Sequence, residues 1–207
     1  RPPMPDDLRP QVDPILETVK AMGLPLLCVA GVEADDVIGT LCRKGSEAGK
    51  AVLVSTGDKD LAQLVNEHVT LVNTMNDTVL DRDGVRQKFD VWPEQIIDYL
   101  ALVGDSSDNI PGVPKVGAKT AAKWLNLYPS AEDIIEHADE IKGKVGESLR
   151  EHIEQLKLSR ALATVKLDVE LPVDFSDLVA SEPDVDTLRE LYKRYELRTL
   201  LKPKQHR

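Results

Sequence analysis

The sequence lacks several features that mark membrane, secreted or zinc-binding proteins. It has no run of about 18 apolar residues, and its first ten residues lack the basic-then-apolar pattern of a signal peptide. We therefore expect a cytoplasmic protein with no membrane partner. The two cysteines, Cys28 and Cys42, have no CxxC spacing and lie near apolar stretches, so we expect reduced, buried thiols. The histidines show no ligand spacing, which gives a histidine metal site no support.

Positive charge is also scarce. The chain has 36 acidic residues against 26 lysines and arginines, a formal net charge of −10. Taken alone, this balance disfavours a nucleic-acid partner. Carboxylates that surround metal ions lose much of their negative charge once the cations bind, so the placement of the acids matters more than their number.

Apolar periodicity predicts an α/β core followed by a mainly helical region. The runs LPLLCVA (24–30) and AVLVST (51–56) are typical of buried parallel strands, and 69–75 and 78–80 are expected to be strands around a turn. A boundary near residue 90 separates the two regions. The expected helices cover 6–22 with a kink at Pro14, the stretch from Val37 to near Gly49, 93–104, 117–128, a stretch from Ser130, one around 149–156 and one around 188–195.

Acidic residues gather in three short motifs. Two of them, GVEADDVIG and STGDKDLAQLV, follow predicted strands, at the edge of an open α/β sheet where ligands bind. The third, VGDSSDN, follows a predicted helix, where negative charge opposes the helix dipole. The acids concerned are Glu33, Asp35, Asp36, Asp58, Asp60, Asp105 and Asp108.

Each motif also has a simpler interpretation. Asp35 and Asp36 could be ordinary first-turn acids of a helix, Asp58 a helix cap, and Asp105 and Asp108 turn residues. Taken jointly, clusters of oxygen ligands without histidine or cysteine favour hard divalent ions, Mg²⁺ or Mn²⁺. Two such ions are a known device for phosphoryl chemistry.

A lysine-bearing hairpin follows the third motif, in IPGVPKVGAKTAAKWL (110–125). Glycines allow close backbone approach, and the N–H groups at a helix start form an anion site. This is the pattern of a helix-hairpin-helix, which grips a nucleic-acid backbone without reading bases. The alternative is a tight helical hairpin with solvated lysines. The candidate DNA-binding residues are Gly112, Val113, Lys115, Gly117, Lys119 and Lys123.

These motifs, in this order and spacing, closely resemble the 5′ nuclease domains of the flap endonuclease family, as found in bacterial DNA polymerase I. The resemblance implies an α/β fold with a PIN-like (Rossmann-like), mainly parallel sheet and a helix-hairpin-helix region. Residues 1–90 would form the C-terminal part of the PIN-like core, including the end of a helical arch in RPPMPDDLRPQV, and 91–207 the DNA-binding region. The family cleaves 5′ flaps, duplex 5′ ends and RNA primers with Mg²⁺ or Mn²⁺.

By this resemblance, catalysis would depend on Asp35, Asp58 and Asp60. Glu33, Asp35 and Asp36 would serve mainly a first metal ion, and the other four acids mainly a second. The hairpin, in the family often with a bound K⁺, would hold the duplex backbone. We expect a monomer, which in the polymerases is fused to a polymerase domain.

The resemblance also has a departure. Family members carry a further segment before the equivalent of Arg1, with the first core strand and two more metal-binding aspartates, so the resemblance implies an internal fragment. A second hypothesis is therefore a non-catalytic, duplex-DNA-binding fragment. A third, an unrelated Mg²⁺ phosphohydrolase on a Rossmann-like sheet, leaves the hairpin without a role.

Overall fold

The computed structural model describes residues 3–201, which fall into two compact units. One unit combines Arg1–Gly31 with Leu171–Arg207, and the other is Val32–Glu170. Across residues 3–201, none of the helices is both long and apolar enough to cross a lipid bilayer.

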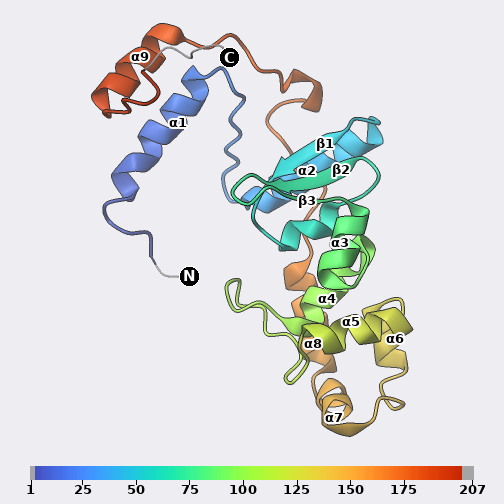
Figure 1. The fold of residues 1–207 in the computed structure, drawn as a ribbon. Coiled ribbons are helices and arrows are strands. Elements are labelled where there is room, and N and C mark those ends of the chain that lie inside the picture. The colour runs from blue at the N-terminus through green and yellow to red at the C-terminus, as the bar shows by residue number, and fades with distance from the viewer. Residues whose placement is uncertain (1–2, 202–207) are drawn as a thin grey trace. The chain divides into compact units, whose positions relative to one another are not determined.

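The first unit pairs helices from the two ends of the chain. Its elements are η1 (Arg9–Gln11), α1 (Val12–Ala21), η4 (Phe175–Asp177) and α9 (Val185–Arg194), shown in blue and orange-red in Figure 1. Helices α1 and α9 pack together, with Leu191 of α9 buried. The Asp184 N–H donates to the Ala21 carbonyl oxygen at 2.8 Å, so the start of α9 is fixed to the end of α1.

Helix α1 is shorter than the sequence predicts. The predicted start at residue 6 is wrong, because α1 begins at Val12 after a turn and the 3-10 helix η1. Pro14 consequently lies in the first turn of α1, where a backbone N–H has no intrahelical acceptor. The predicted kink at Pro14 is therefore also wrong.

Residues 24–30 do not form the predicted buried strand. They are irregular in structure, and Cys28 is exposed, contrary to the prediction of a buried thiol. A strand needs a neighbour to accept its backbone hydrogen bonds. The described sheet consists of β1 (Val52–Ser55), β2 (Val69–Asn73) and β3 (Thr78–Leu80), and none of these strands pairs with residues 24–30. Cys42 is buried as expected, and burial raises the pKa of its thiol to about 11.

The second unit contains a small sheet and most of the helices (Figure 1). Its elements are α2 (Ala34–Glu47), β1 (Val52–Ser55), η2 (Asp60–Leu64), β2 (Val69–Asn73), β3 (Thr78–Leu80), α3 (Arg82–Phe89), η3 (Pro93–Gln95), α4 (Ile96–Val103), α5 (Ala118–Leu127), α6 (Ala131–Glu136), α7 (Gly143–Glu151) and α8 (Ile153–Ala163).

The strands have the order β1-β2-β3, with β1 parallel to β2 and β2 antiparallel to β3. Val54, Leu71 and Leu80 occupy neighbouring register positions and are all buried, whereas Leu53 and Val79 on the other face are 68% and 57% exposed. The sheet thus packs through one face. The parallel pair brings the carboxyl ends of β1 and β2 to one edge, and the STGDKD segment leaves β1 there.

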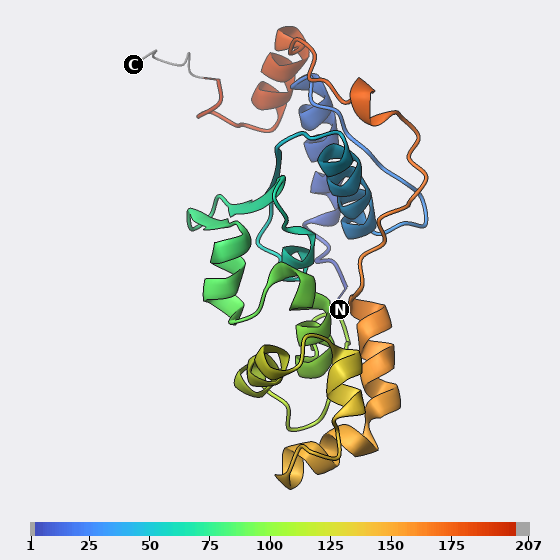
Figure 2. The ribbon, with the colours of Figure 1, turned by 90° about the vertical axis from the view of Figure 1, so that its right-hand side faces the viewer.

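Helices α4 to α8 form the other end of this unit, as Figures 1 and 2 show. Asp98 of α4 is buried, and its carboxylate accepts from Arg160 Nε of α8 at 2.6 Å and from the Ala131 N–H of α6 at 3.0 Å. One carboxylate therefore links three helices. The predicted helix around 149–156 is instead two helices, α7 and α8, because the chain turns at His152.

Candidate metal and nucleic-acid site

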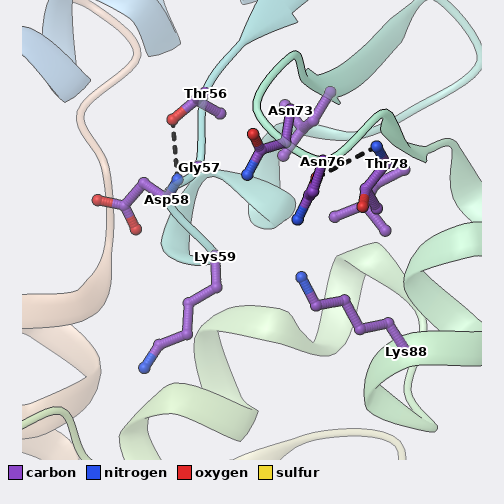
Figure 3. A pocket seen from close by; sticks show the side chains of 10 residues that line it. Thr56, Gly57, Asp58, Lys59, Asn73, Asn76, Thr78 and Lys88 are labelled. Atoms are coloured by element: carbon purple, nitrogen blue, oxygen red, sulfur yellow. Dashed lines mark hydrogen bonds between the residues drawn. The ribbon is translucent and has the colours of Figure 1, made fainter.

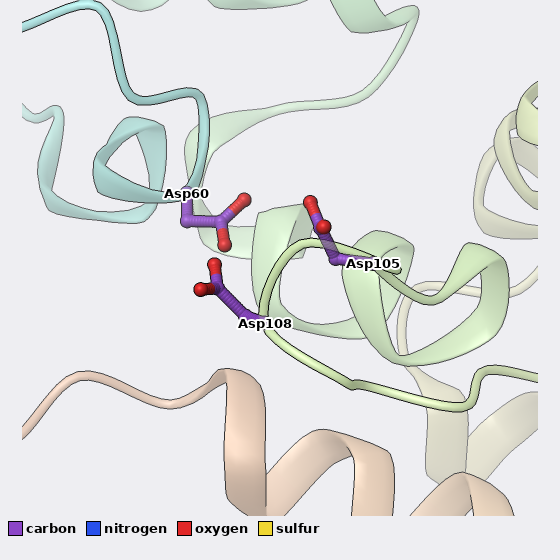
Figure 4. A group of neighbouring side chains, drawn as sticks. All are labelled: Asp60, Asp105 and Asp108. Atoms are coloured by element: carbon purple, nitrogen blue, oxygen red, sulfur yellow. The ribbon is translucent and has the colours of Figure 1, made fainter. Parts of the chain in front are cut away.

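Three carboxylates from two distant segments converge in the second unit. Asp60 opens η2, and Asp105 and Asp108 lie in the loop that follows α4; one oxygen of each lies within 4.8 Å of the others. Figure 4 shows the three side chains turned toward one another. We call these three residues the acidic group.

The segment after β1 is held by its own side chains. The Thr56 hydroxyl accepts from the Asp58 N–H at 3.0 Å, and Asp58 Oδ1 accepts from the Asp60 N–H at 2.9 Å. Asp58 thus forms an Asx turn just before η2, whose N-cap residue is Lys59 without a side-chain cap bond, so Asp58 is not the helix cap of its simpler interpretation. This contact occupies one carboxylate oxygen of Asp58 and leaves the second for other partners.

The loop after α4 is closed by reciprocal backbone bonds. The N–H groups of Asp105 and Ile110 each donate to the carbonyl oxygen of the other residue, at 2.9 and 2.8 Å. The Ser107 N–H donates to Asp105 Oδ1 at 2.7 Å. Asp105 is thus a turn residue, as its simpler interpretation held. The same turn points its carboxylate toward Asp60 and Asp108.

Lys59, which sequence reasoning missed, is bound to this group. Its Nζ donates to Asp105 Oδ2. This hydrogen bond lowers the pKa of the Asp105 carboxyl and raises that of the Lys59 ammonium. The sequence did hold a signal for Lys59, namely its position between Asp58 and Asp60. A residue between two clustered acids must lie within a few ångströms of them.

Asp60 lies in an environment that disfavours its negative charge. Burial, and next the charge of Asp58, raise the pKa of its carboxyl to about 6. Its Oδ1 is buried and has no hydrogen-bond partner among the described residues. A buried carboxylate oxygen without a partner is costly, and a cation would relieve that cost.

Only part of the predicted metal set meets here. Asp35, in the first turn of α2, has a raised pKa from burial, Asp58, Glu33 and Asp108 in that order, so it is an electrostatic neighbour of Asp58 and Asp108. Glu33 is the N-cap residue of α2. Asp36 Oδ1 instead accepts from the Lys166 N–H at 2.9 Å. Glu33, Asp35 and Asp36 thus start a helix rather than follow a strand, contrary to the prediction.

The hairpin between α4 and α5 is closed by internal bonds around Gly112. Its N–H donates to Ser159 Oγ at 3.1 Å, and its carbonyl oxygen accepts from Gln155 Nε2 at 2.7 Å. Gly112 has φ +65°, and an added Cβ would lie 2.6 Å from the Gly104 nitrogen. Gly112 therefore closes the loop, and its N–H does not face a phosphate.

The hairpin is exposed at Pro114, Lys115 and the start of α5. Val113 is 3% exposed and belongs to the core, with its N–H bonded to the Leu102 carbonyl oxygen. Gly117 is the N-cap residue of α5 and is exposed. Of the candidate DNA-binding set, the exposed members are Lys115, Gly117, Lys119 and Lys123.

The side chains at the acidic group fit a divalent cation. All available ligand atoms are carboxylate oxygens, which suit Mg²⁺ or Mn²⁺. The unpartnered Asp60 Oδ1 supplies an oxygen that no described residue satisfies. Asp35 and Asp58 extend the negative charge beside the three carboxylates.

The chain belongs to the 5′-3′ exonuclease family. Family models described as "5′-3′ exonuclease, N-terminal resolvase-like domain" and "5′-3′ exonuclease, C-terminal SAM fold" match residues 1–90 and 91–186. A 5′-3′ exonuclease of Aquifex aeolicus is 41% identical, over 98% of this chain and 69% of that protein. DNA polymerase I of Pseudomonas aeruginosa is 53% identical over 97% of this chain, which spans only 23% of the polymerase.

A solved structure has the same fold. The flap endonuclease of bacteriophage T5, determined as a complex with DNA and metal ions, is 25% identical with a TM-score of 0.60. The match covers 82% of this chain and 60% of that one. The α/β, PIN-like fold with a helical region of the helix-hairpin-helix type is thereby confirmed.

Proposed function

We propose that the protein is a metal-dependent, structure-specific 5′ nuclease that hydrolyses phosphodiester bonds. Its substrates would be DNA with a 5′ flap or a duplex 5′ end, and RNA primers. The protein would act on them as a monomer in replication and repair. The observation that carries this proposal is the acidic group, whose buried Asp60 oxygen has no partner in the described part of the chain, in the same unit as a lysine-bearing hairpin. The T5 relative was solved with both DNA and metal ions, which supports both parts.

Asp60, Asp105 and Asp108 would hold one divalent ion, Mg²⁺ or Mn²⁺. Asp35 and Asp58 would serve a second, with Glu33 and Asp36 at its periphery. When bound, such ions polarise the scissile phosphate and stabilise the developing charge on the leaving oxygen. The Ser107 N–H and the Asp60 N–H orient Asp105 and Asp58 for this task.

Lys59 would have a positioning role. Its ammonium neutralises Asp105 while the acids are metal-free, so the carboxylates can stay close together. Because Lys59 Nζ occupies Asp105 Oδ2, a cation that uses this oxygen must share it or displace the ammonium. We expect Lys59 to lower the affinity for the ion while preserving the geometry of the group.

The hairpin would grip the duplex backbone. Lys115, Lys119 and Lys123 are exposed, and the N–H groups at the start of α5 favour an anion. These groups contact phosphates rather than bases, so binding would depend on DNA shape and salt rather than sequence. A K⁺ ion at this hairpin stays a prediction.

The test is a matched pair of variants assayed with a labelled 5′ flap. Asp58→Asn should abolish cleavage in Mg²⁺ or Mn²⁺ and leave flap binding intact. Lys115→Ala combined with Lys119→Ala should weaken binding and reduce its salt dependence. Normal cleavage by Asp58→Asn would refute the role of the acids. Fast turnover of small phosphate esters with no flap binding would favour a general phosphohydrolase.

A further inference from the structure

A polar pocket lies beside the acidic group, where β1 and β2 end. It is lined by residues of the segment after β1, of the β2–β3 turn and by Lys88 of α3 (Figure 3). Lys59 lines it too, and the same lysine bonds Asp105 of the acidic group. The two sites therefore share a side chain.

The amides of this pocket are oriented by the turn itself. Asn73 Oδ1 accepts from the Met75 N–H at 2.9 Å, and Asn76 Oδ1 accepts from the Thr78 N–H at 3.2 Å. Because the two oxygens are taken by the backbone, the two Nδ2 groups are left to face the pocket. Figure 3 shows both nitrogen atoms on the side toward Lys88. The turn thus presents two hydrogen-bond donors.

Lys88 supplies a charge to the same space. Figure 3 shows its ammonium extending toward the two amides, and it lies 5.3 Å from the centroid of the Phe89 ring. Within residues 3–201, Lys88 forms no ion pair. The Asp58 carboxylate, the acid among the lining residues, points away from Lys88 and the amides (Figure 3). We call Asn73, Asn76 and Lys88 the donor pocket.

Gly57 leaves the room that these donors need. A Cβ at this position would lie 3.2 Å from Asn73 Nδ2, closer than ordinary van der Waals contact. A side chain there would therefore push against the amide. Two neutral donors and one ammonium without a facing carboxylate favour an anion with several acceptor oxygens.

We propose that the donor pocket binds a backbone phosphate of the nucleic-acid strand that passes the acidic group. This inference rests on the proposed function and adds a contact outside the hairpin. A free phosphate dianion would be repelled by the neighbouring carboxylates and by the net charge of −10. A phosphodiester carries less charge and arrives tethered to a strand already held elsewhere, which raises its effective concentration.

The test uses three variants that each change the net charge by −1. Lys88→Gln removes the ammonium, and Asn76→Asp replaces the Nδ2 donor but keeps an oxygen for the Thr78 N–H. Gln87→Glu is the matched control, because Gln87 is exposed and adjacent to Lys88 on α3 but does not line the pocket. Binding of a labelled 5′ flap is measured in EDTA over a range of salt concentrations, with melting curves as the check of folding.

Lys88→Gln and Asn76→Asp should each weaken flap binding about five-fold, and Lys88→Gln should reduce the salt slope by about one. Gln87→Glu should change affinity less than about two-fold, with an unchanged slope. If the unaltered protein binds and cleaves the flap but all three variants bind alike, this inference fails and the proposed function stands. If the unaltered protein binds no flap, both fail.

Inorganic phosphate distinguishes the two sources of the anion. Phosphate binding is followed by ³¹P line broadening in the unaltered protein and in Lys88→Gln. We expect no broadening at millimolar phosphate in either. Broadening that Lys88→Gln abolishes, together with unchanged flap affinity, would make the pocket a site for free phosphate and overturn the assignment to a strand.

Discussion

The hairpin directly follows Asp105 and Asp108 of the acidic group in the chain, but the two parts satisfy their polar groups in opposite ways. The hairpin bonds its backbone internally, as the contacts of Gly112 with Ser159 and Gln155 show. The acidic group keeps a buried Asp60 oxygen that has no partner within residues 3–201, and Lys59 neutralises Asp105. The hairpin therefore satisfies its polar groups internally, whereas the acidic group leaves a buried oxygen for which we propose a cation as the partner.

The largest expected effect concerns the closed hairpin. Gly112→Ala should lower the free energy of unfolding by about 3 kcal/mol, because φ is +65° and the new Cβ would meet backbone atoms of Gly104 and Val103 at 2.6–2.7 Å. Gly117→Ala is the control, since a Cβ at this position would meet no neighbouring atom within 4 Å among the described residues, and should cost less than about 1 kcal/mol. Urea unfolding measures both. Equal effects would refute the closed-loop account.

The carboxylate that links three helices around the hairpin comes next. Asp98→Ala should lower the free energy of unfolding by about 2 kcal/mol, because it leaves Arg160 Nε and the Ala131 N–H without their acceptor, while Arg160 Nη1 keeps only the Glu132 carboxylate at 3.4 Å. The comparison is Asp139→Ala, whose side chain is 98% exposed and which should have almost no effect. A similar loss in both variants would show that Asp98 does not anchor these helices.

The acidic group should respond in the opposite direction. Asp60→Asn removes a charge that burial and Asp58 disfavour, so we expect the melting temperature of the metal-free protein at pH 8 to rise by about 3 °C. The same change should abolish stabilisation by Mn²⁺. Asp139→Asn should alter neither value. A fall in melting temperature for Asp60→Asn would contradict the inferred repulsion.

The smallest expected effect is the pH dependence of the metal-free protein. The pKa of Asp60 is raised to about 6 in the folded state, above its ordinary value of 3.8. Between these values the folded state binds more protons than the unfolded one, so this group lowers stability as the pH rises. Melting curves without metal from pH 4 to pH 7 should show this loss in the unaltered protein and a smaller loss in Asp60→Asn. Identical curves would contradict it.

The sequence predicted those parts whose signals are local. Strands β1, β2 and β3 and helices α4 and α5 follow from apolar runs, Gly104 and Gly117, and the structure confirms them. The strand at 24–30 failed because an apolar run forms a strand only beside a partner. The predicted start of helix α1 was wrong, because apolar periodicity does not distinguish an isolated turn from the first turn of an α-helix.

For the site, the spacing of the motifs identified the acidic residues but not the partner that each of them contacts. Asp60, Asp105 and Asp108 do meet, whereas Asp36 bonds the Lys166 N–H far along the chain. Such a contact depends on the fold and has no local signal. Gly112 was expected to let the backbone approach a ligand, but it instead packs closely against the backbone of Gly104 and Val103. The sequence does not distinguish these two roles, because either close approach requires a glycine.

The most direct test follows binding and cleavage of one labelled 5′ flap across Mn²⁺ concentrations, starting in EDTA. The hairpin satisfies its polar groups internally, whereas the acidic group leaves an Asp60 oxygen without a partner among the described residues. The flap should therefore be bound in EDTA and cleaved only as Mn²⁺ is added. Cleavage that persists in EDTA, or binding that appears only in step with cleavage, would contradict this account.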